Sequence, residues 1–197
     1  MSEAAFSAAV IALGGRSDRE AYVSLVRAYA EGERAYHNMA HIETSLATAR
    51  RLVKDPGPHV SLALLYHDAV YDPRAKDNEA RSAVLARSSL ASLGLREEDL
   101  AEIERLILVT RDHVSSDAAS ALVVDADLAI LASSKVEYDA YAAAIRREYA
   151  FVPDADYRVG RTRVLEGLLA RERLFSSPLL DESAARTNLR REIEGLR

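Results

Sequence analysis

The segment VSLALLYHDAV (residues 60–70) is apolar almost all round until it reaches a histidine and an aspartate. A helix that is apolar on every face lies in the centre of a domain, so this segment predicts the central helix of the fold. Pro56-Gly57-Pro58 precedes the segment, and Asp72-Pro73 breaks the chain after it. Positions 60, 64 and 67 fall on one face of such a helix, so we expect His67 to point inward.

Helix signals continue on both sides of this segment. Alanine occurs 35 times and leucine 25 times, and both residues favour helices. Ser17-Asp18-Arg19-Glu20 has the form of a capping box, and the helix that it starts would bury Tyr22, Val26 and Tyr29. Apolar spacings of three and four, with Pro and Gly between them, predict further helices near the N-terminus, over residues 39–52, 79–93 and 100–110, and after residues 134, 154 and 178.

One short stretch, Leu122-Val123-Val124, is typical of a strand. A single strand forms no sheet. The sequence therefore predicts an all-α bundle of about eight to ten helices, which we expect to form one domain over residues 1–197.

Composition excludes several classes of protein. The 197 residues carry a net charge of −5, with 49% hydrophobic and 29% charged residues, as in a globular domain. The absence of cysteine excludes disulfides, thiolate zinc sites and cysteine nucleophiles. No segment approaches the roughly 18 apolar residues of a membrane span, and the first residues carry Glu3 without a basic flank, unlike a secretory signal. We therefore expect a cytoplasmic protein whose partner is neither a membrane nor a nucleic-acid duplex; a homodimer stays open.

Histidines and carboxylates carry the chemistry. His37 and His41 are four residues apart and can share a helix face, while His67 and Asp68 are adjacent. Asp127 lies on an apolar face, where an ionised carboxylate is costly unless it is paired or binds a metal. Three helices thus direct His or Asp inward, which predicts one shared divalent cation held by imidazole nitrogen and carboxylate oxygen. Mn, Fe, Mg, Zn, Ni and Co all suit this donor set, with one or two ions. His59 lacks this context, and we expect an ordinary surface residue.

The ordered pattern of His, His-Asp and Asp is accompanied by longer motifs. These are RAYHNMAHI (34–42), YHDAVYDP (66–73), DNEARSA (77–83), Thr110 with His113, DADL (125–128), YRVGR (157–161) and ARTNL (185–189). Together they resemble the HD superfamily of metal-dependent phosphohydrolases, in particular a bacterial branch labelled "predicted metal-dependent HD superfamily phosphohydrolase". The resemblance covers roughly residues 20–196. It implies the HD-domain helical fold and hydrolysis of a phosphoester in a nucleotide or another small phosphorylated metabolite.

The resemblance also implies roles for single residues. His41 matches the first ligand histidine, His67 and Asp68 match the doublet, and Asp127 matches the last aspartate. Asp127 is preferred to Asp125 because the ligand of the family sits in an Ala-Asp-Leu setting. Asp68 would also bridge a second cation or orient the nucleophile.

The segment Tyr36-His37-Asn38 is similar to the start of the corresponding motif in cyclic nucleotide phosphodiesterases, which share the HD fold. There the first histidine of the motif is the general acid, which maps that role onto His37. Those enzymes have a further histidine three residues after the doublet, where this chain has Tyr71. We therefore do not expect a cyclic nucleotide substrate.

Other residues are candidates for supporting roles. His113 lines the site or ligates a second metal, or instead caps a helix end. Glu79 holds a ligand histidine by its free N–H, or instead sits at a helix N-terminus that favours negative charge. Phosphate suits the bidentate fork of arginine, and the candidates from the motif neighbourhoods are Arg34, Arg81, Arg158 and Arg161.

Three other readings stay open. Asp125-Ala126-Asp127 after an apolar run is also found in phosphatases of the haloacid-dehalogenase type, but these need a parallel sheet. HD-type sites can also hold two irons and activate oxygen. Finally, the chain could bind a nucleotide as a sensor without turnover.

Overall fold

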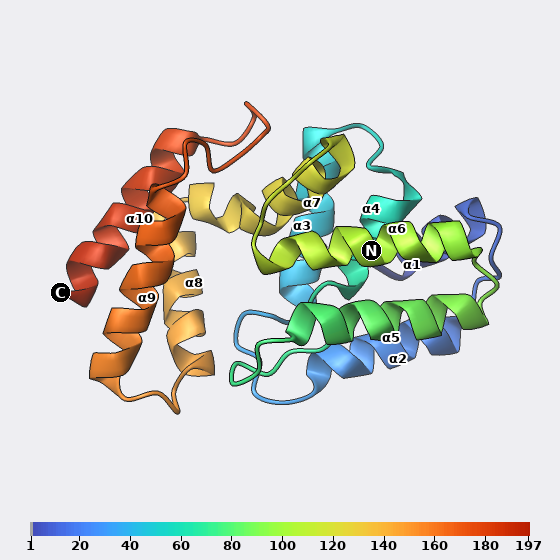
Figure 1. Ribbon diagram of the computed structural model, residues 1–197, viewed down its shortest axis with the longest axis horizontal. Helices are drawn as coiled ribbons and strands as arrows, with labels where there is room; N and C mark the ends of the chain where they lie inside the picture. The colour runs from blue at the N-terminus through green and yellow to red at the C-terminus, as the bar shows by residue number, and fades with distance from the viewer. Residues whose placement is uncertain (1) are drawn as a thin grey trace.

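The computed structural model describes residues 2–197, and within that range the chain forms ten α-helices, two short 3₁₀ helices and no strand (Figure 1). The predicted all-α class and the predicted number of helices are confirmed. In chain order the elements are α1 (Ser2–Ala12), α2 (Arg19–Ala30), α3 (Met39–Leu52), α4 (Gly57–Tyr66), α5 (Asn78–Ser92), α6 (Glu97–Leu108), η1 (Val109–Arg111), α7 (Ala118–Leu128), η2 (Ala129–Ala132), α8 (Lys135–Glu148), α9 (Asp154–Leu169) and α10 (Glu182–Leu196).

Helix α4 is the centre of the first hydrophobic core, as predicted. All of its residues from Val60 to Tyr66 are buried, and it contacts α1, α3, α5, α6 and α7. Burial on every face accounts for the absence of a polar stripe from its sequence. Helix α2 is tied to it by the Tyr29 hydroxyl, which donates to the Leu65 carbonyl at 2.9 Å.

The central helix ends earlier than the sequence predicts. Its last residue is Tyr66, so Asp68 lies in the turn that follows the helix and not in the helix itself. In this turn, side chains form hydrogen bonds with the backbone groups that no longer have partners within a helix. Arg34 donates to the carbonyls of Asp68 and Ala69, and the Ser82 hydroxyl bonds both backbone groups of Val70.

The predicted strand at residues 122–124 is wrong, because these residues lie inside α7. A capping box between Asp117 and Ser120 starts this helix. Leu122, Val123 and Val124 are all buried in it, and a short apolar run inside a buried helix has the same pattern as a buried strand.

The start of α2 also differs from its prediction. Asp18 and not Ser17 is the capping residue, and its carboxylate accepts the Glu20 N–H at 2.8 Å. The buried positions of the helix are Leu25 and Tyr29. Tyr22 is only half-buried, at the edge of this face.

A second hydrophobic core joins the C-terminal part of α7, η2 and helices α8, α9 and α10. Figure 1 shows these last three helices standing together on one side of the molecule, connected to the rest through α7. Helix α10 contacts α9, α8 and η2. None of the described helices is long and apolar enough to cross a membrane. The junction of the two cores, at the end of α7, is where the predicted ligands meet.

Candidate metal centre

Two histidines from different helices meet in the interior. The Asn38 side chain accepts the Ala40 N–H and starts α3, which places His41 on the inward face of the first turn. His67 follows the last residue of α4. Both are buried, and their Nε2 atoms lie 3.2 Å apart. His67 Nδ1 lies 3.0 Å from the Leu64 carbonyl and donates to it, so Nε2 of the neutral ring presents a lone pair.

Two carboxylates complete the cluster. Asp68 Oδ2 lies 3.1 Å from His67 Nε2 and 3.5 Å from His41 Nε2. Asp127 Oδ1, from the last turn of α7, lies 3.2 Å and 3.5 Å from Nε2 of His41 and His67. Asp68 Oδ2 is buried and has no hydrogen bond when the His67 ring is neutral, since the Nε2 that it faces at 3.1 Å then carries no proton; a buried acceptor without a donor is costly.

This donor set fits a divalent cation. Ligand atoms of His41, His67 and Asp68 all lie within 4.8 Å of one another, and Asp127 Oδ1 lies within 3.5 Å of Nε2 of both histidines. Imidazole and carboxylate together suit several first-row cations. A cation here would give Asp68 Oδ2 its missing partner.

Electrostatics also indicate that the cluster requires positive charge. Burial opposes protonation of His67, but the carboxylates of Asp68 and Asp127 outweigh it and raise the pKa of His67 well above its ordinary value. Burial favours the neutral form of Asp127, but His67 and the hydrogen bonds from the histidines hold the pKa of that carboxyl well below its usual range. A metal ion and protons are therefore alternative ways to satisfy the same four groups.

His113 belongs to the same cluster. Its Nε2 lies 3.0 Å from Asp127 Oδ2, the oxygen that does not face His41. The residue adopts a φ of 54°, a left-handed conformation that a side chain other than glycine adopts at a cost and that is often found at functional sites. Arg171 donates to its carbonyl at 2.9 Å. The His113 imidazole thus orients Asp127. Of the two roles considered for His113, the structure supports a position beside the predicted ligands and not a helix cap.

Beside the cluster, His37 is held by a glutamate that the sequence analysis missed. Glu148, the last residue of α8, has Oε2 2.6 Å from His37 Nδ1. Its Oε1 accepts the backbone N–H groups of Tyr36 and His37 at 2.7 and 3.0 Å, and the Tyr71 hydroxyl donates to Oε2 at 3.1 Å. The Tyr71 ring also stacks on His37, with centroids 4.2 Å apart. Tyr71 therefore contacts both members of the His37–Glu148 pair.

The His37–Glu148 pair favours a charged imidazole. Burial opposes the charge, but Asp68 and the hydrogen bond to Glu148 outweigh it and raise the pKa of His37. For Glu148, burial would raise the pKa, but the hydrogen bond and charge of His37 lower it to about 2. A histidine with an adjacent carboxylate can hold a proton at neutral pH and release it to a neighbouring atom.

The cluster opens into a cleft of about 910 Å³ between the two cores, a size typical of small-molecule sites. Asp68, Asp127, His37, His113 and Glu79 all line it. Its walls add aromatic and basic side chains from both halves of the chain, which are Tyr36, Tyr71, Tyr141, Tyr149, Tyr157, Lys76, Arg111, Arg161, Arg163 and Arg171.

The four arginines expected to bind phosphate are divided among different places. Only Arg161 lines the cleft, and it is paired with Glu192 at 2.7 Å. Arg158 donates to the Leu196 carbonyl. Arg34 is occupied by backbone carbonyls, and with Arg81 it lines a different cavity.

Two further residues have structural partners. Asp125 is buried and accepts the backbone N–H groups of Ser176 and Ser177 at 2.9 and 2.7 Å, away from the histidines. His59 is only partly exposed, and its Nε2 lies 2.9 Å from Asp99 Oδ1. His59 thus lies outside the cluster and partly at the surface, but it has a specific partner that the sequence analysis did not predict.

Comparison of the chain with protein-family models, with curated proteins and with solved structures found no match. The geometry of the cluster and the cleft therefore carries the functional argument.

Proposed function

We propose that the chain is a metal-dependent phosphohydrolase of the HD superfamily that cleaves a phosphoester in a small phosphorylated metabolite. One observation carries the proposal. Four ligand atoms from three parts of the chain converge on one buried point, where Asp68 Oδ2 has no hydrogen-bond partner. This point opens to a cleft that also contains the His37–Glu148 pair.

His41, His67, Asp68 and Asp127 would hold the cation. A divalent cation in such a site lowers the pKa of water and polarises phosphoryl oxygens, which supplies a nucleophile at neutral pH. His113 fixes the second oxygen of Asp127 and so holds the carboxylate in one orientation. Asp68, with one oxygen facing the histidines and its side chain on the cleft, would orient the attacking water.

His37 would act as the general acid. With Nδ1 held by Glu148, the other ring nitrogen is the one available to the cleft. The protonated ring can donate a proton from Nε2 to the leaving oxygen of the ester, and Glu148 stabilises the charged ring before transfer. Tyr71 holds the ring from one face by stacking. Such acid catalysis contributes about 10²–10⁴-fold to the rate.

The first test is elemental mass spectrometry of the purified protein, with His67→Ala and Asp68→Ala as site variants and His59→Ala as the control. We expect about one or two metal equivalents in the wild type and the control, and none in the two folded site variants. Absence of metal after reconstitution with Mn²⁺, Fe²⁺, Zn²⁺, Ni²⁺ and Co²⁺ would refute the metal site.

The second test separates chemistry from metal binding. The metal identified above is used in a panel of phosphomonoesters, phosphodiesters and nucleotides with wild type and His37→Ala. We expect His37→Ala to retain the metal and to lose turnover by about 10²–10⁴-fold. Equal loss of metal and turnover would overturn the acid role. Metal content without turnover on any phosphoester would overturn the proposed reaction.

A further inference from the structure

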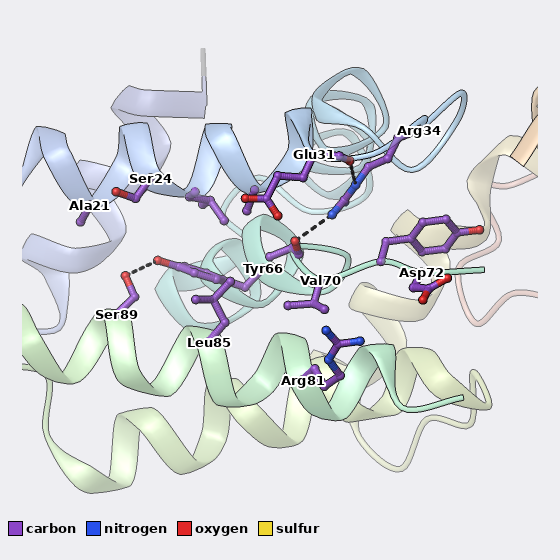
Figure 2. A pocket seen from close by; sticks show the side chains of 14 residues that line it. Ala21, Ser24, Glu31, Arg34, Tyr66, Val70, Asp72, Arg81, Leu85 and Ser89 are labelled. Carbon is purple, nitrogen blue, oxygen red and sulfur yellow. Dashed lines mark hydrogen bonds between the residues drawn. The ribbon is translucent and has the colours of Figure 1, made fainter. Parts of the chain in front are cut away.

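A second cavity of about 420 Å³ lies between α2 and α5. The side of α2 that faces it carries small residues. Figure 2 shows Ala21 and Ser24 there, and Ala28 also lines the cavity. Its floor is formed by residues on either side of the His67-Asp68 doublet. Tyr71 is the one lining residue that it shares with the metal cleft. The volume lies within the range of roughly 300–1,000 Å³ typical of small-molecule sites.

Charged groups of both signs line this cavity without forming close ion pairs with one another. The lining contains Arg34, Arg81, Glu31 and Asp72. Among the described residues, no ion pair within 4.0 Å joins any of these four to another. Figure 2 shows Glu31 on the α2 side and Arg81 rising from α5 toward Val70.

The two arginines differ in how they are used. The Arg34 guanidinium is occupied by the carbonyls of Glu31, His37, Asp68 and Ala69, at 2.6 to 3.2 Å. The Arg81 guanidinium is exposed, and within residues 2–197 no side chain or carbonyl accepts a hydrogen bond from it. Arg81 therefore keeps its full planar fork available for a carboxylate.

We propose that this second cavity binds a small zwitterion of the size of an amino acid, with its carboxylate on Arg81 and its ammonium group on Glu31. A purely anionic ligand would face the two carboxylates of the lining, and a purely cationic ligand would face the two guanidinium groups. A ligand with one positive and one negative group can pair with both the Arg81 guanidinium and the Glu31 carboxylate. Its apolar side chain would lie against Leu25, Val70 and Leu85, which also line the cavity.

The test is isothermal titration calorimetry with L-leucine and L-phenylalanine as probes. L-Leucinamide lacks the carboxylate and N-acetyl-L-leucine lacks the ammonium group, so they serve as matched controls. We expect at least one of the two zwitterions to bind with a Kd of about 1 mM or tighter. Each control compound should bind at least about 10-fold more weakly.

Variants locate the binding. Arg81→Gln and Glu31→Gln change exposed side chains without protein partners, so both should fold, and each should weaken binding of the zwitterion by about 10- to 100-fold. Arg158→Gln, on the surface and away from this cavity, should leave it unchanged. The proposal is overturned if neither zwitterion binds or if L-leucinamide binds as tightly as L-leucine. It is also overturned if Arg81→Gln and Glu31→Gln leave the Kd of the zwitterion unchanged.

Discussion

Replacement of Glu148 by glutamine tests whether this residue acts on His37 through its charge. The carboxylate accepts four hydrogen bonds, two from backbone N–H groups, one from His37 Nδ1 and one from the Tyr71 hydroxyl. Glutamine keeps the shape and one acceptor oxygen. It removes the charge and places an NH₂ group opposite His37 and Tyr71, so the charge-assisted hydrogen bond from His37 Nδ1 is lost.

The magnitude follows from the lowered pKa of Glu148. A fall from 4.5 to about 2 in the folded state, at 1.36 kcal/mol per pKa unit, corresponds to about 3 kcal/mol of stability. Since the folded-state pKa lies below the unfolded-state pKa, this stabilisation is complete above about pH 5. It is lost as the pH falls toward 2, and about half of it is left at pH 3.

Urea denaturation of wild type and Glu148→Gln at pH 7 and pH 3 measures this effect. The difference in free energy of unfolding should be about 3 kcal/mol at pH 7 and should shrink by about half at pH 3. A titration followed by NMR should also show a lower pKa for His37 in the variant, because the carboxylate that stabilises the charged ring is absent. An equal destabilisation at both pH values, with the pKa of His37 unchanged, would refute a role for the charge of Glu148.

Three further predictions concern stability. Asp125→Ala leaves the part-buried hydrogen bonds from the Ser176 and Ser177 backbone N–H groups without their acceptor and should cost about 1–3 kcal/mol in urea denaturation. Metal content should not fall; loss of metal would show that Asp125 also serves the cluster. Gly15→Ala would place a Cβ 2.6 Å from Leu95 Cδ1 and should lower the free energy of unfolding by about 1–3 kcal/mol. In Gly160→Ala the new Cβ meets nothing within 4 Å, so this variant should stabilise α9 by about 0.5–1 kcal/mol. Equal effects of the two substitutions would contradict the packing argument. Mn²⁺ at 100 times its Kd should stabilise the folded wild type by about 2.7 kcal/mol and so raise its thermal midpoint by about 5–10 °C. The thermal midpoint of Asp127→Asn should not change. An equal rise in the variant would show that the ion binds elsewhere.

The architecture could be predicted where burial leaves a clear pattern. Helix α4 is apolar on all sides and lies at the centre, and His67 points inward because it continues the buried face. The same kind of pattern misled at residues 122–124, since a short buried run of valines does not distinguish helix from strand. The helix there depends on the capping box at Asp117, which lies outside the run.

The candidate site was predictable only in part. His67 and Asp127 could be selected because each follows buried apolar positions, whereas His41 and Asp68 are expected as ligands from the resemblance of their motifs. The structure brings all four side chains together. Glu148 has no such signal, because it ends an ordinary amphipathic helix and reaches His37 across 111 positions of sequence.

The arginines show a second limit of the sequence. Residue spacing does not reveal which side of a turn a guanidinium faces. Arg34 and Arg81 therefore lie at a different cavity from the one that their motifs suggested.

Helix α7 carries two aspartates, two positions apart, that hold different halves of the molecule. Asp127 faces the histidines of the first core, and Asp125 holds the loop at Ser176 and Ser177 that precedes α10. A small rotation or sliding of α7 along its axis would move both contacts together. Binding of a metal ion to the cluster would thus also affect the loop before α10. The backbone amides of residues 176 and 177 would then exchange hydrogen more slowly, although they do not contact the ion.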